Sequence, residues 1–370
     1  MKKCLLVLLC LMMILPCALA EEGEMFSYNN SQYVLQEDGS AAQTTFGLYL
    51  SSTYNTLSSD GIKKFSSYYI PDTVFYNDQT IRVTALRSGN IVRIFYDNRN
   101  YTTTNIPLDN TIYTFEAWVY QIDIPSSIKS IETNVFYNFP NLSTIYVAPD
   151  HNVFALIKGV LFDKTSFSLI SYPRGLTAKK YAIPQGIKRV GDQAFMNNTV
   201  LNSITIPDSI VEIGVSAFQY CKELNNVVLP GSVKTIGNQA FANSSSLSNI
   251  TLSEGLETIG TRAFANCGGL RSITLPESLK TIGDNAFENT SLTSLNIPAS
   301  VTSIGANAFP KGCLLHVERD SYAARWAYEN NYRYDYPNDT SDPLSWLNGA
   351  EEEPDTGAEN LITTDTSWLN

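Results

Sequence analysis

Histidine is scarce in this sequence, and the motifs that would give it catalytic chemistry are missing. Only His151 and His316 occur, in units far apart along the chain. A His-dependent triad needs a nucleophile and an acid beside one of them, and a metal site needs a cluster of His, Cys or carboxylate side chains. No pattern suggests either, and no G-x-S-x-G, P-loop or H-E-x-x-H motif is present. We therefore expect a protein that is not an enzyme, with no catalytic residue, no metal ligand and no cofactor.

Basic residues are also few, and long apolar runs are nearly absent. The chain has 25 Lys and Arg against 36 Asp and Glu, and residues 334–370 hold no Lys or Arg. The rest of the chain is then close to neutral and offers no footprint for nucleic acid. After residue 15, no segment reaches the roughly 18 apolar residues of a membrane-spanning helix. We expect no nucleic-acid partner and no transmembrane span.

The one marked apolar run lies at the start, in MKKCLLVLLCLMMILPCALA. Lys2 and Lys3 precede it, and the small-residue site Ala18-Leu19-Ala20 follows it. This order is typical of a secretory signal peptide. The sequence therefore predicts a signal peptide over residues 1–20 and a protein that is secreted or held on the extracellular cell surface.

The sequence does contain one motif that is repeated every 22–23 residues. Its anchor is a proline, replaced once by Ser253, and the other anchors are Pro184, Pro207, Pro230, Pro276 and Pro298. Each unit then has aliphatic residues three and six positions later, a Gly, and an Ala-Phe pair. The phenylalanines are Phe195, Phe218, Phe241, Phe264, Phe287 and Phe309. A fixed period of this length is the signature of a stacked repeat architecture.

Each position of the unit has a physical interpretation. The alternation at Ile204-Thr205-Ile206 predicts a half-buried strand, and the next proline ends it because it cannot donate to a ladder. The Gly, such as Gly237, suits a turn with positive φ. The Phe is expected to stack on the Phe of the next unit, because no single unit can bury it alone.

Three cysteines lie beyond residue 20, namely Cys221, Cys267 and Cys313, each 46 residues from the next. Cys221 and Cys267 occupy the same position of units that are two repeats apart. Adjacent strands lie about 4.8 Å apart, so these two should be roughly 10 Å apart, beyond the ~7 Å limit for a disulfide. The sequence predicts buried free thiols.

The repeated units, with one unit interrupted by "GVLFD…LISYP", resemble the BspA-like leucine-rich repeat family of bacterial surface and secreted proteins. The likeness covers residues 122–317 and, more weakly, 69–85. It implies a repeat solenoid, a β-rich right-handed superhelix of 22–23-residue leucine-rich repeats with short helical turns. It also implies export and adhesive or host-interaction roles, without specifying a ligand.

Five segments follow from these patterns. After the signal peptide, residues 21–121 form an aromatic-rich N-terminal cap with degenerate repeats, or alternatively an aromatic binding surface. Residues 122–317 form the solenoid, with a hairpin inserted near 155–175. Residues 318–336 form a C-terminal cap, with a helix that begins after Ser321 and has Trp326 in its core. Residues 337–370 form an acidic tail that we expect to be disordered.

The outward positions of the repeated strands are small, neutral and rich in hydroxyl groups. Such residues stabilise a sheet by cross-strand contacts, and they also offer a long surface suited to a macromolecule rather than a metabolite. We therefore hypothesise a secreted binding protein that adheres to a host protein or glycan through Thr205, Val228, Thr251, Thr274 and Asn296. The alternative is an exported structural spacer or envelope component, docked through the Ser-Trp-Leu-Asn copies of the tail that contain Trp346 and Trp368.

Overall fold

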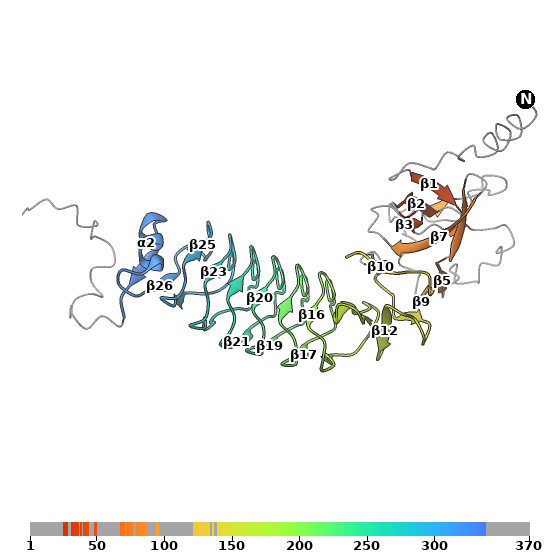
Figure 1. The fold of residues 1–370 in the computed structure, drawn as a ribbon. Coiled ribbons are helices and arrows are strands. Elements are labelled where there is room, and N and C mark those ends of the chain that lie inside the picture. The colour runs from red at the N-terminus through yellow and green to blue at the C-terminus, as the bar shows by residue number, and fades with distance from the viewer. Residues whose placement is uncertain are drawn as a thin grey trace, which may run out of the picture.

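The structure is a computed structural model that describes residues 25–28, 31–36, 38, 40–43, 48–49, 67–70, 72–76, 79–86, 94–95, 121–133, 135–136 and 139–337. The predicted signal peptide, most of the aromatic-rich segment and the tail, with Trp346 and Trp368, lie outside these residues. The described part is an elongated stack, with the sheet of the N-terminal segment at one end and helix α2 (Tyr322–Glu329) at the other (Figure 1).

Two rows of short strands run along the stack (Figure 1). Across the longer row the order is β12 (Phe154–Ile157), β13 (Val160–Asp163), β14 (Ser168–Ser171), β16 (Arg189–Val190), β18 (Glu212–Ile213), β20 (Thr235–Ile236), β22 (Thr258–Ile259), β23 (Thr281–Ile282) and β25 (Ser303–Ile304). The second row contains a four-stranded sheet of β15 (Lys180–Ala182), β17 (Ser203–Thr205), β19 (Asn226–Leu229) and β21 (Asn249–Leu252). It continues in a sheet of β24 (Ser294–Asn296), β26 (Leu314–His316) and β27 (Arg333–Asp335).

The regular units stack in parallel with a constant register. Val190 pairs with Ile213, which pairs with Ile236, and each step is one repeat of 23 residues. Between the two strands of a unit, N–H groups bond to carbonyls three residues back, as from Ala217 to Gly214 and from Gln219 to Ser216. These bonds are the short helical turns of the predicted repeat. The predicted repeat solenoid is therefore confirmed.

A column of phenylalanine rings fills the centre of the stack. Phe218 and Phe241 stack with ring centroids 5.1 Å apart, and Phe241 and Phe264 with centroids 5.4 Å apart. The column continues to Phe287 and Phe309 at 5.3 and 6.0 Å. All these rings are fully or almost fully buried. The predicted Phe-on-Phe stacking is confirmed, and it makes one continuous core out of units that have none alone.

Glycine is required at the repeated positions for a reason other than the positive φ that the sequence suggests. None of Gly191, Gly214, Gly237, Gly260, Gly283 and Gly305 has positive φ; left-handed φ falls instead two residues later, as at Gln239 (φ 57°). A Cβ on Gly237 would lie 2.7 Å from the carbonyl carbon of Gly214. The prediction of a left-handed glycine is therefore wrong, and the real reason is the close approach of two backbones.

Two further positions link each unit to its neighbour. In the cysteine slot, Cys221 Sγ donates to the Phe195 carbonyl at 3.1 Å, and Ser244 Oγ donates to the Phe218 carbonyl at 2.8 Å. After the repeated Gly, every second unit has Asp or Asn, whose Oδ1 accepts the N–H of the next unit; these are Asp192, Asn238 and Asp284. At both positions the residue type alternates from one unit to the next, so the sequence repeats most closely over two units.

The interruption after Pro149 consists of antiparallel strands. β13 pairs with β12 on one side and with β14 on the other, across the turn at Lys164–Phe167. Two hydrophobic cores meet at β13, because Val160 and Phe162 belong to the core of the regular units while Leu161 belongs to the core of the upstream units. The inserted strands therefore connect two separately packed parts.

Upstream of the insertion, the described strands still stack in parallel. β11 (Thr144–Val147) pairs with β9 (Gln121–Ile124), and β9 pairs with β5 (Ser67–Tyr69). A second sheet contains β1 (Met25–Tyr28), β2 (Ser31–Leu35), β3 (Ala41–Gln43), β6 (Thr73–Tyr76), β7 (Gln79–Leu86) and β10 (Ser130–Ile131); β4 (Leu48–Tyr49) pairs with β8 (Ile94–Phe95). The weak repeat at 69–85 thus falls next to a strand that stacks on the solenoid.

The other end of the stack is closed by α2 and β27. The Ser321 side chain accepts the Ala324 N–H, so the helix begins where the sequence predicts. Trp326 is buried, with its ring edge-on to Phe309 at 5.7 Å and stacked on Tyr332 at 5.1 Å. The last ring of the phenylalanine column is therefore covered by aromatic residues of this end.

Candidate functional site on the outer strand face

The five residues predicted to bind a partner are all exposed, and four of them, all except Thr274, lie on strands of the second strand row. Thr205 of β17 pairs with Val228 of β19, and Val228 pairs with Thr251 of β21. Because these strands are parallel and in register, the three side chains lie next to one another on one face. We call the exposed side of β17, β19 and β21, together with Thr274 and β24, the strand face.

The strand face is not one continuous sheet, contrary to the expectation for Thr274. Residues 271–276 are not a β-strand, although Thr274 is exposed as predicted. The four-stranded sheet therefore ends at β21. Asn296 lies in the next sheet, where it pairs with His316 of β26. The structure brings together the first three predicted residues and places Asn296 beyond an interruption.

The chemistry of the strand face is neutral over the regular units. Val228 is 59% exposed, which is high for a valine in a strand. Next to it, Asn249 Nδ2 donates to Asn226 Oδ1 at 2.9 Å. Such a surface offers hydrogen bonds and some apolar area, with no net charge to select a cation or an anion.

Toward the C-terminal end the same face acquires charge that the sequence reasoning missed. His316 Nδ1 lies 2.6 Å from Asp335 Oδ1, and both side chains are about one quarter to one third exposed. His316 and Asp335 are cross-strand partners in β26 and β27. The available signal in the sequence was the alternation of Tyr332, Tyr334 and Tyr336, because a strand at this place puts Asp335 beside His316.

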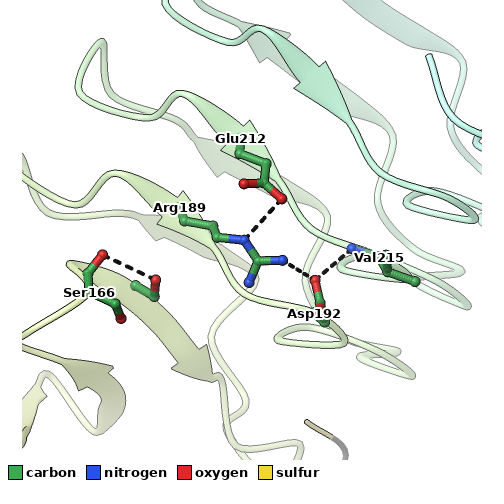
Figure 2. Close-up of polar contacts among 6 residues, drawn as sticks. Ser166, Arg189, Asp192, Glu212 and Val215 are labelled. Atoms are coloured by element: carbon green, nitrogen blue, oxygen red, sulfur yellow. Dashed lines mark hydrogen bonds and ion pairs between the residues drawn. The ribbon is translucent and has the colours of Figure 1, made fainter. Parts of the chain in front are cut away.

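Charged side chains on the longer strand row form ion pairs with one another. Figure 2 shows Arg189 between Glu212 and Asp192, with Nε 3.0 Å from the Glu212 carboxylate. Asp192 also accepts the Val215 N–H at 2.8 Å. These groups are engaged in linking consecutive units.

The other histidine also has a structural role. His151 is buried, and its Nδ1 accepts the N–H groups of Val153 and Phe154 at 3.1 Å. Burial lowers the pKa of the His151 imidazole from its usual value, which favours the neutral ring that this acceptor role needs. Asn198 makes bonds of the same pattern at a different position of the repeat, where its Oδ1 accepts the N–H groups of Val200 and Leu201. His151 therefore caps a turn.

The three described cysteines are free and buried, which confirms the prediction for Cys221 and Cys267. Burial raises the pKa of the Cys221 and Cys267 thiols to about 12 and that of Cys313 to about 11. Because the thiolate is the reactive form, these thiols are poor nucleophiles and poor metal ligands at neutral pH. Within the described ranges, no group of three His, Cys, Asp or Glu side chains is placed to hold a metal ion. The same ranges contain no helix long and apolar enough to cross a membrane.

Comparison with protein families identifies the repeat. The model of the BspA-type leucine-rich repeat region matches six copies, over residues 90–183 and 188–315. These matches cover more than half of the chain, so the protein belongs to the BspA-type leucine-rich repeat family. Proteins of this family are often surface proteins involved in binding, and no particular target is assigned by the match.

Solved structures with similar folds come from several bacteria. A leucine-rich repeat protein from Eubacterium ventriosum is 22% identical, with a TM-score of 0.46, and the match covers 79% of this chain and 95% of that one. The pneumococcal vaccine antigen PcpA is 14% identical, with a TM-score of 0.47, covering 84% of this chain and 97% of that one. No curated protein matches the chain. At these identities and scores, the two structures indicate no function for this chain.

Proposed function

We propose that this protein is exported and binds a macromolecular partner, a host protein or glycan, through the strand face, without catalysis. The observation that carries the proposal is the in-register exposure of Thr205, Val228 and Thr251 along a rigid stack. A metabolite would need a concave site that buries most of its surface, whereas this face is long and neutral. Family membership supports the choice of a binding role over an enzymatic one.

Export is part of the proposal. It rests on the signal-peptide pattern of residues 1–20, which lie outside the described part of the chain. Three buried thiols without a disulfide partner are compatible with export here, because burial protects them from oxidation. Expression of the chain in a bacterial host, followed by fractionation and mass measurement of the exported form, tests both export and cleavage after Ala20.

The binding surface is tested with a variant that carries Thr205→Arg, Val228→Arg, Thr251→Arg and Thr274→Arg. All four side chains are exposed, so the fold should persist while the face becomes bulky and basic. Binding to immobilised matrix proteins and to a glycan array should weaken about tenfold or more, about 1.4 kcal/mol. The salt dependence of any residual binding identifies nonspecific attraction to anions.

The matched control places four arginines elsewhere on the same units, as Val211→Arg, Val215→Arg, Thr302→Arg and Ser303→Arg. These side chains are also exposed and neutral, and they belong to the longer strand row and its turns. The control should bind as the parent does. Equal loss in both variants, or unchanged binding by the strand-face variant, would show that another surface binds the partner.

A further inference from the structure

The outer face of the sheet upstream of the insertion differs from that of the regular units. β11 pairs in parallel with β9, and Tyr146 lies opposite Asp123. Thr144 lies opposite Gln121 in the same pair. The residues that alternate with them along both strands are buried, so these four side chains share the outer face. We call the four the tyrosine patch.

Tyr146 exposes an aromatic ring at the edge of this sheet. The residue is 53% exposed, which is high for an aromatic residue in a strand. β11 is the last strand in the order β11-β9-β5, so no further strand of the described residues pairs with it on its other side. Thr144 is exposed as well, and Asp123 and Gln121 are half-buried. The ring therefore lies beside polar side chains and is open to solvent on the side away from β9.

A hydrogen bond orients the two polar side chains of β9. Gln121 Nε2 donates to Asp123 Oδ1 at 2.7 Å. No lysine, arginine or histidine of the described residues forms an ion pair with Asp123. Asp123 Oδ2 and Gln121 Oε1 are further acceptors, and the hydroxyls of Thr144 and Tyr146 both donate and accept. The tyrosine patch therefore offers donors and acceptors around one aromatic ring.

The regular units have no such combination of side chains on their strand row. The outward positions of β17, β19 and β21 hold Ser, Thr, Asn and Val. Contacts between small neighbouring side chains account for those positions, because they stabilise the sheet. An exposed ring beside a carboxylate occurs at none of them, so it is not required by the repeated architecture. We infer that it has a local role.

The size and chemistry of the tyrosine patch fit one sugar ring. Neighbouring strands lie about 4.8 Å apart and alternate residues of one strand about 7 Å apart, so the patch is far smaller than the roughly 800 Å² of a protein epitope. Sugar hydroxyls both donate and accept hydrogen bonds, as the patch does. The negative face of an aromatic ring attracts the C–H groups on the apolar face of a sugar.

Charged ligands match the tyrosine patch less well. An anionic sugar is disfavoured, because the one charge within the patch is the Asp123 carboxylate. A lysine or arginine side chain would match Asp123 and the Tyr146 ring, but it only donates hydrogen bonds. The hydroxyl donors of Thr144 and Tyr146 would then have no acceptor on the ligand. A neutral sugar uses both kinds of group.

We propose that the tyrosine patch binds a neutral pyranose, as one residue of a glycan. The Tyr146 ring packs against the apolar face of the sugar, Asp123 and Gln121 accept its hydroxyl protons, and the Thr144 hydroxyl donates to a sugar oxygen. The site uses none of the strand-face residues and does not rest on the proposed function. A failure of either proposal therefore leaves the other unaffected.

Saturation-transfer NMR on the full-length protein tests the site. The probes are the methyl glycosides of glucose, galactose, mannose and N-acetylglucosamine. At least one of them should bind with a dissociation constant in the millimolar range, and saturation should be strongest on the protons of its apolar face. Tyr146→Ala should weaken that binding about tenfold or more, because it removes the ring. Tyr146→Phe keeps the ring and should weaken binding by less than about threefold.

Three further variants define the site. Asp123→Asn should weaken binding about threefold or more, because a carboxylate accepts hydroxyl protons more strongly than an amide. Tyr328→Ala is the matched control: Tyr328 is 44% exposed on α2, and its loss should leave binding unchanged. The strand-face variant with four arginines should bind the glycosides as the parent does. Thermal melts show whether each variant is folded.

Three results would overturn the proposal. The first is no saturation transfer to any of the four glycosides up to about 50 mM, well above the affinity expected for a single sugar residue. The second is an equal loss of binding in Tyr146→Ala and Tyr328→Ala. The third is tighter binding of N-acetyl-lysine N-methylamide than of every glycoside, with loss in Asp123→Asn, which would make the tyrosine patch a site for a cationic side chain.

Discussion

At the scale of single residues, the spacing between adjacent turns decides which side chains are allowed. The repeated glycines lie where the backbone of the preceding unit leaves no room for a Cβ. In the cysteine slot, the small side chains of Ser244 and Cys267 both donate to the Phe carbonyl of the preceding unit. These positions select residues by volume and by one hydrogen bond.

Gly237→Ala should destabilise the solenoid although alanine is a conservative change. The added Cβ would lie 2.7–2.8 Å from backbone atoms of Gly214 and Val215, so the two turns must move apart. We expect a loss of about 1–3 kcal/mol, the usual cost of overpacking, measured by chemical denaturation. Gly268→Ala is the control: nothing lies within 4 Å of its Cβ position, so its stability should change by less than about 0.5 kcal/mol. Equal effects of the two changes would contradict the close-approach explanation.

At the scale of elements, each strand of the two long rows has only two to four residues, so the hydrogen bonds between strands contribute little of the stability by themselves. The phenylalanine column supplies the long-range contact, because every ring touches the ring before it and the ring after it. At the C-terminal end, Trp326 and Tyr332 complete the column. The helix and the last strand thus serve as a cover for aromatic rings.

Phe241→Ala should cost about 3–5 kcal/mol of unfolding free energy, because it removes a fully buried ring between two others. Phe167→Ala is the matched control. Its ring is 54% exposed at the turn between β13 and β14, so its removal should cost less than about 1 kcal/mol. Denaturant melts of the two variants give the comparison, and a small loss for Phe241→Ala would mean that the stack rearranges around the gap.

At the scale of the whole molecule, the core has two parts that meet at the inserted strands. The larger core runs from Val160 to Ala327, and the smaller one from Tyr33 to Leu161. In a stack, each unit contacts only its neighbours, so stability is a sum of local terms. The two parts are therefore able to respond separately to a local change.

Hydrogen exchange measured by mass spectrometry should show this separation. In the Phe241→Ala variant, we expect faster exchange in the strands from β17 to β26, and unchanged exchange in β9 and β11. The physical reason is that β9 and β11 pack in the other core. Uniform acceleration over both parts would show a single cooperative unit instead.

Much of this architecture could be predicted from the sequence, because repetition reports which residues are equivalent. The period located the phenylalanine stack and the buried thiols of Cys221 and Cys267, and the capping residue Ser321 located the start of the helix. The reason why glycine is required at position 237 could not be predicted, because spacing along the chain does not report the distance between adjacent turns. The absence of a β-strand at Thr274 could not be predicted either, because the sequence around Thr274 matches that of units that do form a strand.

The candidate sites were predicted unevenly for the same reason. Thr205, Val228 and Thr251 follow from strand alternation, so the sequence could place them at neighbouring exposed positions. The shortened turn of the interrupted unit was not predicted: Tyr172, whose ring stacks on Phe195, comes three residues after Leu169, whereas Phe195 comes five residues after its equivalent, Val190. The only sequence signal was the 35-residue spacing from Pro149 to Pro184, which indicates extra length but not which turn is shortened.

The alternation of the cysteine slot bears on how the number of repeats changes over time. Cys221 and Cys267 are separated by the unit that contains Ser244, so loss of that one unit would place the two thiols in adjacent turns. Their Cα atoms would then be about 4.8 Å apart, within the range of a disulfide. The bonds from Asp192, Asn238 and Asp284 to the following units would also lose their alternation. Recombination that adds or removes units in pairs keeps both patterns, so we expect length variants of this stack to differ by steps of 46 residues.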